Sequence, residues 1–396
     1  MDTISGIASK LKYINQDEDT IKKAKIENCV GSIKVPVGIA GPLSVNGTDG
    51  TDGLFHAPLA TSEATLVASC SRGCKVFNAS GGVRFKVLRE TMTRGPVFWF
   101  SSPGDAISFY DLVPSLFSEF QDAAESTSKH AKLLRIEPKL IGSTVHVLFE
   151  YYCGNAVGQN MATFATEKAC DRFAASDHAR VVKLQKVTIE GQLAAEKSLS
   201  WRNILQSRGV AVMAWGTVTP EACQRVLGIS TWDLYQLIQN SKEAATRTGQ
   251  LGYNINQVNV IAAMFIACGQ DAGSIAESAW SHLATEFNDE TKELGVSTYL
   301  PSLPVGTVGG GTVLDTQREA LEILGCSGPG SKGRLAGLIA SFSLALDIST
   351  VAAVTNNTMG PFQMLDSDGQ LMDLEIHFLL FESSRRSASS RRSRIL

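Results

Sequence analysis

Residues 132–152 read KLLRIEPKLIGSTVHVLFEYY, and their alternation of apolar and polar side chains predicts two neighbouring β-strands. A strand-like FWF at 98–100 and a helix-like DLVPSLFSEFQDAAEST at 111–127 come before this stretch. A glycine turn and another helical run follow it. The resulting order, β-α-β-β-α-β, is the ferredoxin-like pattern, so residues 97–186 are predicted to form a small domain inserted into a larger one.

The larger domain is predicted to come from residues 1–96 and 187–380, which makes the chain an α+β protein of two domains. Helical segments dominate from Glu190 onward, among them the apolar run QVNVIAAMFIACGQDA at 257–272. Residues 381–396 interleave arginines with serines, a composition typical of a disordered tail.

Two segments near the N-terminus carry clear local signals. IKVPVGIAGPL at 33–43 combines prolines, glycines and β-branched residues, which predicts a strand broken by turns. TSEATLVASCSRGCKVF at 61–77 places apolar residues at helical spacing behind a Thr/Ser cap. This second pattern predicts a buried helix that Gly81 and Gly82 end.

Charge and composition exclude several classes of partner. The formal net charge is -3 and the pI is near 6.1, so no basic surface is predicted for nucleic acid or an anionic membrane. No uncharged apolar run approaches the ~20 residues that span a bilayer, and the first residues do not resemble a leader peptide, so we expect a soluble cytoplasmic chain. The eight cysteines lack C-x-x-C spacing, which indicates reduced thiols and no metal site.

The segment GPGSKG at 328–333 fits the dinucleotide pattern G-x-G-x-x-G, and Asp347 follows it at nearly the expected distance. A Rossmann site needs a strand directly before the first glycine, whereas DTQREALEILGC looks helical. We therefore interpret 328–333 as a loop between helices. A strand before Gly328 would instead favour an unrelated dehydrogenase.

Two other glycine-rich segments are candidates for ligand binding. GNAVGQN at 154–160 joins a predicted strand to a helix that starts near Asn160, an arrangement that suits a phosphate or a ribose. An ordinary strand-to-helix turn explains the same pattern. In PSLPVGTVGGGTVL at 301–314, the glycines 309–311 allow a close approach of the backbone to a ligand or to a packed helix.

Five further segments, taken in order along the chain, give these motifs a specific meaning. They are ENCVGSIKVPVGIAGPL (27–43), SRGCKV (71–76), ETMTRGPV (90–97), GYNINQVNVIAAMFIACGQDA (252–272) and PVGTVGGGT (304–312). Together they resemble the catalytic domain of a eukaryotic-type hydroxymethylglutaryl-CoA (HMG-CoA) reductase, from about Glu27 to Ser343. The resemblance implies a large helical domain that binds HMG-CoA, a small ferredoxin-like domain that binds NADPH, and active sites at the interface of a homodimer or a dimer of dimers.

The resemblance also implies three catalytic residues. Glu27 matches the glutamate that donates protons, Lys197 the lysine that stabilises the alkoxide formed by hydride arrival, and Asp271 the central aspartate. The residues alone predict less, because a single Glu27 or Lys197 is most simply a solvated charge on a helix. Asp271 stands out without the family, since a carboxylate in the run VNVIAAMFIACGQDA is expected to be buried and paired.

The remaining site residues follow from the resemblance in the same way. Arg72 matches an arginine that meets the CoA phosphates, and Arg94 matches one near the HMG end of the substrate. The other implied substrate contacts are Glu196, Lys242 and Asn259. The implied cofactor contacts are Asn155, Gly158, Asn160, Val308, Gly309 and Gly310.

The chain departs from the family at several charged positions. The family's Asp-Lys-Lys run is Glu196-Lys197-Ser198 here, and Glu190 stands where a serine that contacts the HMG carboxylate is usual. The resemblance therefore implies repulsion between Glu190 and the substrate carboxylate. Asn155 replaces an aspartate of the nucleotide segment.

The family histidine that protonates the CoA thiolate is the largest departure. Its aligned position falls near Asn357, and His377 is the next histidine along the chain. Two hypotheses follow: a reductase of the sterol and isoprenoid precursor pathway that forms mevalonate, or an impaired paralogue that binds HMG-CoA or a related inhibitor without full turnover.

Overall fold

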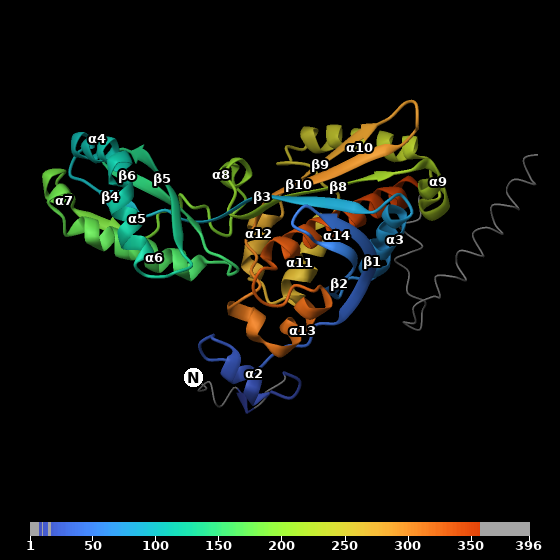
Figure 1. The fold of residues 1–396 in the computed structure, drawn as a ribbon, viewed down its shortest axis with the longest axis horizontal. Helices are drawn as coiled ribbons and strands as arrows, with labels where there is room; N and C mark the ends of the chain where they lie inside the picture. Colours follow the sequence, from blue (N-terminus) through green and yellow to red (C-terminus); the bar gives the residue numbers. More distant parts are fainter. Residues whose placement is uncertain (1–7, 10, 15–16, 357–396) are drawn as a thin grey trace, which may run out of the picture. The chain divides into compact units, whose positions relative to one another are not determined.

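A computed structural model describes residues 8–9, 11–14 and 17–356, and all ten strands in this part of the chain belong to one connected sheet (Figure 1). The strands are β1 (Val37–Gly47), β2 (Asp52–Ala60), β3 (Val83–Arg94), β4 (Val97–Trp99), β5 (Lys132–Ile141), β6 (Thr144–Tyr152), β7 (Lys186–Thr188), β8 (Gly209–Val218), β9 (His282–Phe287) and β10 (Leu294–Leu303). The α-helices are α2 (Glu18–Lys23), α3 (Leu66–Asn78), α4 (Pro103–Leu112), α5 (Phe117–Glu125), α6 (Gln159–Ala174), α7 (Asp177–Val181), α8 (Trp201–Leu205), α9 (Pro220–Ala222), α10 (Thr231–Arg247), α11 (Gln257–Ala267), α12 (Ile275–Ser278), α13 (Asp315–Ile323) and α14 (Lys332–Thr355). Short helical turns are η1 (Val113–Leu116), η2 (Cys223–Leu227), η3 (Ala272–Ser274) and η4 (Gly310–Val313).

Strands β4 to β7 form the predicted ferredoxin-like unit. They pair antiparallel in the spatial order β7-β4-β6-β5, with α4, α5 and α6 in the connections. The alternation in β6 buries Val145, Val147 and Phe149 against these helices. The rings of Phe98 and Phe109 pack there in a tilted arrangement with centroids 4.6 Å apart. The order β-α-β-β-α-β is thus confirmed, and the unit has a hydrophobic core of its own. The domain bounds at 97 and 186 stay a prediction.

Strand β3 joins the two cores. Its residues 83–91 pair with β8, and its last three residues, Met92 to Arg94, pair with β6 of the ferredoxin-like unit. The strand therefore delivers Arg94 to the junction between the two cores.

The second core surrounds helix α14. This helix packs against α3, α11 and the strands β3 and β8. By length and composition it is the one helix among the described residues that could cross a membrane, but 94% of its apolar window is buried inside the protein. Three strands, β8, β9 and β10, accompany the helices after Glu190, where the sequence analysis predicted mainly helices.

The two N-terminal predictions hold with shifted boundaries. Residues 37–47 form β1, whose pairing with β2 shifts register between Ala40 and Leu43, so the strand is broken as predicted. The predicted helix begins at Leu66 instead of Thr61, because Thr65 has a left-handed backbone and supplies no capping hydrogen bond. The tail at 381–396 lies outside the described residues.

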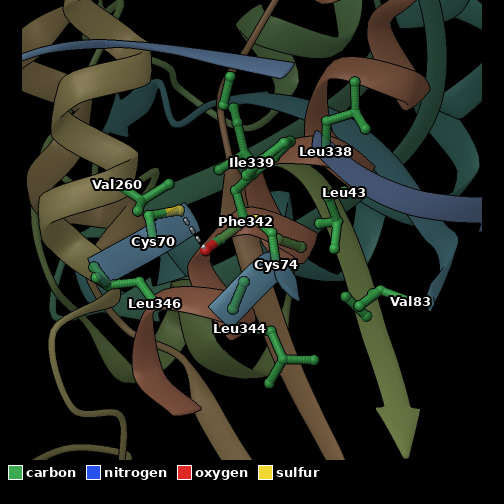
Figure 2. Close-up of a cluster of buried hydrophobic side chains, with 14 of the residues drawn as sticks. Leu43, Cys70, Cys74, Val83, Val260, Leu338, Ile339, Phe342, Leu344 and Leu346 are labelled. Atoms are coloured by element: carbon green, nitrogen blue, oxygen red, sulfur yellow. Dashed lines mark hydrogen bonds between the residues drawn. The ribbon is translucent and has the colours of Figure 1, made fainter. Parts of the chain in front are cut away.

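Helices α3 and α14 cross at very short range (Figure 2). Cys70 and Cys74 are buried in this contact as small apolar groups, and the Cys70 thiol donates to the carbonyl of Phe342 at 3.6 Å. A Cβ atom built on Gly73 would lie 1.8 Å from the carbonyl oxygen of Ala345. Only glycine therefore allows this approach.

Gly73→Ala is accordingly expected to destabilise the protein by about 3 kcal/mol or more, since backbone atoms must move to relieve the clash. Gly104→Ala is the matched control, because a Cβ atom there would meet nothing closer than 3.8 Å. Urea unfolding of both variants measures the difference. Equal stability of the two variants would show that α3 and α14 do not pack this closely.

Candidate active site

Lys197 and Asp271 form an ion pair that is open to solvent. The Lys197 ammonium lies 2.9 Å from Asp271 Oδ2, and the two side chains are 47% and 49% exposed. The hydrogen bond that Lys197 donates to Asp271 raises the pKa of the lysine. Burial alone would raise the pKa of Asp271, but the bonds from Lys197 and from the Gly273 amide outweigh it and lower that pKa. Both groups are thus held in their charged forms.

Asp271 is paired as predicted, but the prediction that it is buried inside an apolar helix is wrong, because its side chain is 49% exposed. Helix α11 ends at Ala267, and Gly269 follows with φ of 68°. Asp271 then accepts from the Gly273 amide at 2.9 Å at the start of a 3-10 turn. The sequence predicted a longer helix because the apolar residues that pack in the core continue through Ala267 and Cys268, where the helix ends.

A buried ion pair contacts the segment that carries Lys197, residues 192–198, called the Lys197 segment below. Arg208 and Glu277 are almost fully buried, and the Arg208 guanidinium donates to Glu277 at 2.6 Å. Glu277 Oε1 also accepts from the backbone amide of Lys197 at 3.4 Å. Arg208 further contacts Gln159 and lies 3.9 Å from Glu196. Sequence analysis missed this pair, because nothing in the local pattern marks either residue as buried.

Arg94 lies between two carboxylates of the chain, Glu190 and Glu196. Its Nη1 atom lies 2.9 Å from Glu196 and 3.5 Å from Glu190, while Nη2 donates to Thr163 at 2.6 Å. Glu190 is fixed further by the Gly95 amide at 3.0 Å. The like charges are therefore neutralised in part by Arg94, whose side chain is only 10% exposed.

The three glycine-rich segments, which are far apart in sequence, meet at one place. The amide of Thr307 donates to the Asn155 carbonyl at 2.9 Å, and the Thr307 hydroxyl donates to the Gly328 carbonyl at 2.7 Å. The Asn155 side chain accepts from the Gly330 amide at 2.8 Å. Helix α13 precedes Gly328, as predicted, so the strand that a Rossmann site requires is not there in this described segment.

These glycine segments also reach Asp271. The Gly306 amide donates to the side chain of Gln270 at 2.8 Å, directly before Asp271. A Cβ atom on Gly311 would lie 2.6 Å from the Gly269 carbonyl, so the two backbones touch. Close packing thus connects the predicted nucleotide segments to the Lys197–Asp271 pair.

The start of α6, in the segment predicted to bind the nucleotide, has backbone features that suit an anion. Gly158 precedes α6 in a left-handed conformation, and among the described residues no side chain caps this helix. The first amides of α6 are thereby available to an anion, and Asn160 is exposed beside them. Around Gly309 and Gly310 a Cβ atom would meet nothing within 4 Å, which leaves room for a ligand.

The structure does not bring every predicted residue to this site. Glu27 lies in an exposed turn, and no contact between it and Lys197 or Asp271 is found in the described part of the chain. Arg72 donates to the Ser349 hydroxyl at 2.9 Å and to its carbonyl at 2.6 Å.

The two remaining substrate predictions lie on helices α10 and α11. Lys242 lies over the Tyr253 ring, 5.7 Å from its centroid. Asn259 donates to Glu63 at 3.2 Å. Asn357 and His377 lie outside the described residues.

Asp347, the acid that a Rossmann reading would place on a ribose, has a structural role instead. It is fully buried in α14 and accepts from the amides of Ile255 at 3.2 Å and Asn256 at 3.0 Å, and from the side chain of Gln257 at 2.9 Å. It therefore fixes the two residues that lead into α11, and it also holds the side chain of the first residue of that helix.

Burial raises the pKa of Asp347 to about 6, although its hydrogen bonds lower it in part. The unfolded chain ionises near the ordinary value of about 3.9, so the native state holds the proton more tightly between these values. The resulting stability is present below about pH 4 and is lost as the pH rises to about 6, about 3 kcal/mol in all. The stability of wild type relative to Asp347→Asn should fall by this amount in urea unfolding across that range, and a constant difference would contradict it.

Comparisons with known proteins agree with this architecture. A structure of the class II 3-hydroxy-3-methylglutaryl-CoA reductase from Streptococcus pneumoniae, described as bound to NADPH in open conformations, superposes with a TM-score of 0.66 at 20% identity. The superposition covers 86% of this chain and 89% of that one. A second S. pneumoniae structure gives a TM-score of 0.67 at 18% identity over 89% of this chain and 92% of that chain. These likenesses define the fold.

Sequence relatives are closer. The 3-hydroxy-3-methylglutaryl-coenzyme A reductase of Methanocaldococcus jannaschii is 35% identical over 347 residues, covering 87% of this chain and 85% of that protein. The Haloferax volcanii protein of the same name is 38% identical over 340 residues, covering 84% and 82%. Reductase 1 of Candida albicans is 32% identical over 87% of this chain, which corresponds to 32% of that longer protein.

The fold and the relatives define the class first: the chain is an oxidoreductase. The profile of the family described as hydroxymethylglutaryl-coenzyme A reductase matches residues 4–360, so the chain belongs to the HMG-CoA reductase family.

Proposed function

We propose that this chain reduces HMG-CoA to mevalonate and free CoA with two NADPH, at the site built on Lys197 and Asp271. Membership of the family supports the reaction, and the ion pair at 2.9 Å is the observation that carries the site. We also propose a cytoplasmic homodimer, in which the half-exposed ion pair lies in reach of the partner subunit. The reaction makes the protein a source of the isoprenoid precursor mevalonate.

The reaction requires two hydride transfers. The start of α6 and the glycine segments would hold NADPH, which would supply the hydride for the thioester carbonyl and for the resulting aldehyde. Each transfer leaves negative charge on the carbonyl oxygen. We assign Lys197 to stabilise that oxygen, because its ammonium is preorganised by Asp271 and is open on its other side.

Between the two hydride transfers the C–S bond breaks and CoA leaves as a thiolate that takes up a proton. A second proton reaches the alkoxide that becomes the alcohol of mevalonate, which balances the four-electron reduction. Glu27 is the proposed proton donor on the strength of the resemblance. The thiolate step lacks the family's histidine at its aligned position, so we expect it to be slower than hydride transfer to the aldehyde.

The substrate carboxylate needs a cation. Arg94 is the proposed partner because its guanidinium lies at the junction of the two cores and next to the Lys197 segment, through Glu196. Arg72 and Lys242 stay proposals for the CoA phosphates and the carboxylate, as does Asn259 for the substrate. In the structure the Arg72 guanidinium is partly buried beside α14, where it donates to the Ser349 carbonyl.

Steady-state assays with purified full-length protein test this function. The expected result is oxidation of NADPH that depends on HMG-CoA, with mevaldehyde reduced faster than HMG-CoA. Reduction of mevaldehyde alone would identify thiolate protonation as the broken step. Binding of HMG-CoA in calorimetry with neither substrate turned over would replace the proposal by that of an impaired binding paralogue.

A further inference from the structure

The backbone that carries Lys197 is strained. Gln192, Ala195 and Lys197 have φ values of 67°, 49° and 54°, so three residues with side chains adopt left-handed conformations within six positions. Such conformations are costly for residues other than glycine, and they persist only where the surroundings fix them. The position of the Lys197 ammonium therefore depends on what holds this segment.

Two buried side chains hold it. Asn203 donates through Nδ2 to the carbonyls of Ala195 at 2.9 Å and Ser198 at 3.2 Å, on both sides of Lys197. Glu277 accepts from the Lys197 amide itself at 3.4 Å. Glu277 is in turn fixed by Arg208 at 2.6 Å, and both side chains are almost fully buried.

Arg208 extends this support to the nucleotide segment. Its Nη2 atom donates to the side-chain carbonyl of Gln159, the first residue of α6, and the same atom lies 3.9 Å from Glu196. One guanidinium thus contacts the carboxylate under Lys197, the residue before Lys197, and the helix whose N-terminus is the proposed phosphate site. Arg208 and Gln159 thus link the two halves of the site directly.

We infer that Arg208 and Glu277 are positioning residues for hydride transfer: they hold Lys197 at the carbonyl oxygen and tie its place to α6. The inference rests on the proposed function of Lys197. A purely structural ion pair predicts something different, because replacing a buried pair commonly changes stability without a specific effect on the chemical step. A positioning role predicts a lower kcat when the pair is broken, whereas a purely structural role predicts a loss of stability with kcat unchanged.

The test compares four variants by kcat and KM for mevaldehyde reduction and by thermal unfolding. Glu277→Gln keeps an acceptor for the Lys197 amide, whereas Glu277→Leu removes it. We expect kcat to fall ~10-fold to ~100-fold in Glu277→Leu with KM for NADPH little changed, because small misplacements of a catalytic group cost this much. Glu277→Gln should recover most of that loss.

Gln159→Leu tests the link to α6. Gln159 is only partly buried and lies at the helix start, so we expect the variant to fold normally, with kcat lowered several-fold. Asp105→Leu is the control, since Asp105 is a carboxylate only 18% exposed and paired with a cation, Lys183 at 3.1 Å, and no bond joins it to the Lys197 segment in the described structure. It should lose stability and keep kcat.

Equal kcat losses in Glu277→Leu and Asp105→Leu would overturn the inference, as would a Glu277→Leu variant that unfolds earlier but turns over normally below its melting temperature. If Glu277→Leu does not fold, the kcat of Glu277→Gln and Gln159→Leu decides, and wild-type kcat in both would contradict the inference. Failure of the wild-type protein to oxidise NADPH with either substrate would instead refute the proposed function.

Discussion

Lys197→Met is expected to lower kcat for both HMG-CoA and mevaldehyde by ~10²-fold to ~10³-fold, because it removes the cation that stabilises the oxygen after hydride arrival. The same change should alter the free energy of unfolding by less than about 1 kcal/mol, since an ion pair with both side chains about half exposed contributes little. Stopped-flow or steady-state NADPH oxidation and urea unfolding measure the two quantities. Calorimetric binding of HMG-CoA should change far less than kcat.

The chain contains a good control for this variant. Lys292 also has a positive φ, of 58°, and also lies near an aspartate, at 3.9 Å from Asp289. It is in the turn between β9 and β10, and no bond joins it to the Lys197 segment in the described structure. Lys292→Met should keep wild-type kcat. A Lys197→Met enzyme within a factor of a few of wild type would exclude Lys197 from the chemical step.

The ferredoxin-like unit could be predicted because its information is local. The alternation over 132–152 fixes which side chains of β5 and β6 are buried, and the helices on either side of the pair complete the order. Strands β8 and β10 were missed because the apolar helices near them dominate the composition of that region. β8 pairs with β10, which is far away in the sequence, so no local sequence pattern predicts this pairing.

The site was predictable to a different extent. Asp271 could be singled out from residues alone, because it follows an apolar run, although the burial expected from that run is wrong and the side chain is half exposed. Its partner could not, because Lys197 is separated from it by more than seventy positions and has no distinctive neighbours. The meeting of the three glycine segments was likewise invisible, although each was recognised by itself.

One such segment was recognised and then set aside. GPGSKG at 328–333 was correctly denied a Rossmann role, yet it packs on Asn155 in the predicted nucleotide segment. Its Lys332 donates to the Gly154 carbonyl at 3.1 Å and lies 3.6 Å from Glu90. A motif that fails one mechanism can therefore still belong to the site, since close backbone packing needs the same glycines.

The two carboxylates beside Arg94 lead to the second prediction, which concerns KM for HMG-CoA. The guanidinium faces two carboxylates, Glu196 at 2.9 Å and Glu190 at 3.5 Å, in a nearly buried position. A substrate carboxylate that approaches Arg94 must therefore compete with two negative groups already in place. Glu190 is the one that the family resemblance marks as unusual, because a serine is expected there.

Glu190→Ser is accordingly expected to lower KM for HMG-CoA by ~10-fold, equivalent to about 1.4 kcal/mol of relieved repulsion, with KM for NADPH unchanged. Glu125→Ser is the matched control, since Glu125 also pairs with a cation, Lys132 at 2.7 Å, and accepts a backbone amide, that of Leu133 at 3.1 Å. Both variants should lose about 1–2 kcal/mol of stability from those bonds, but only Glu190→Ser should change KM.

Glu196, the other carboxylate beside Arg94, helps to distinguish an effect on substrate binding from an effect on the chemical step. Glu196 also lies 3.9 Å from Arg208 and directly precedes Lys197, so Glu196→Gln should change kcat as well as KM. Glu190 has no bond to the Lys197 segment in the described structure, so Glu190→Ser should act on KM alone. A raised KM in Glu190→Ser would mean that Glu190 helps to hold the substrate, and an unchanged KM would remove Arg94 as the receptor of its carboxylate.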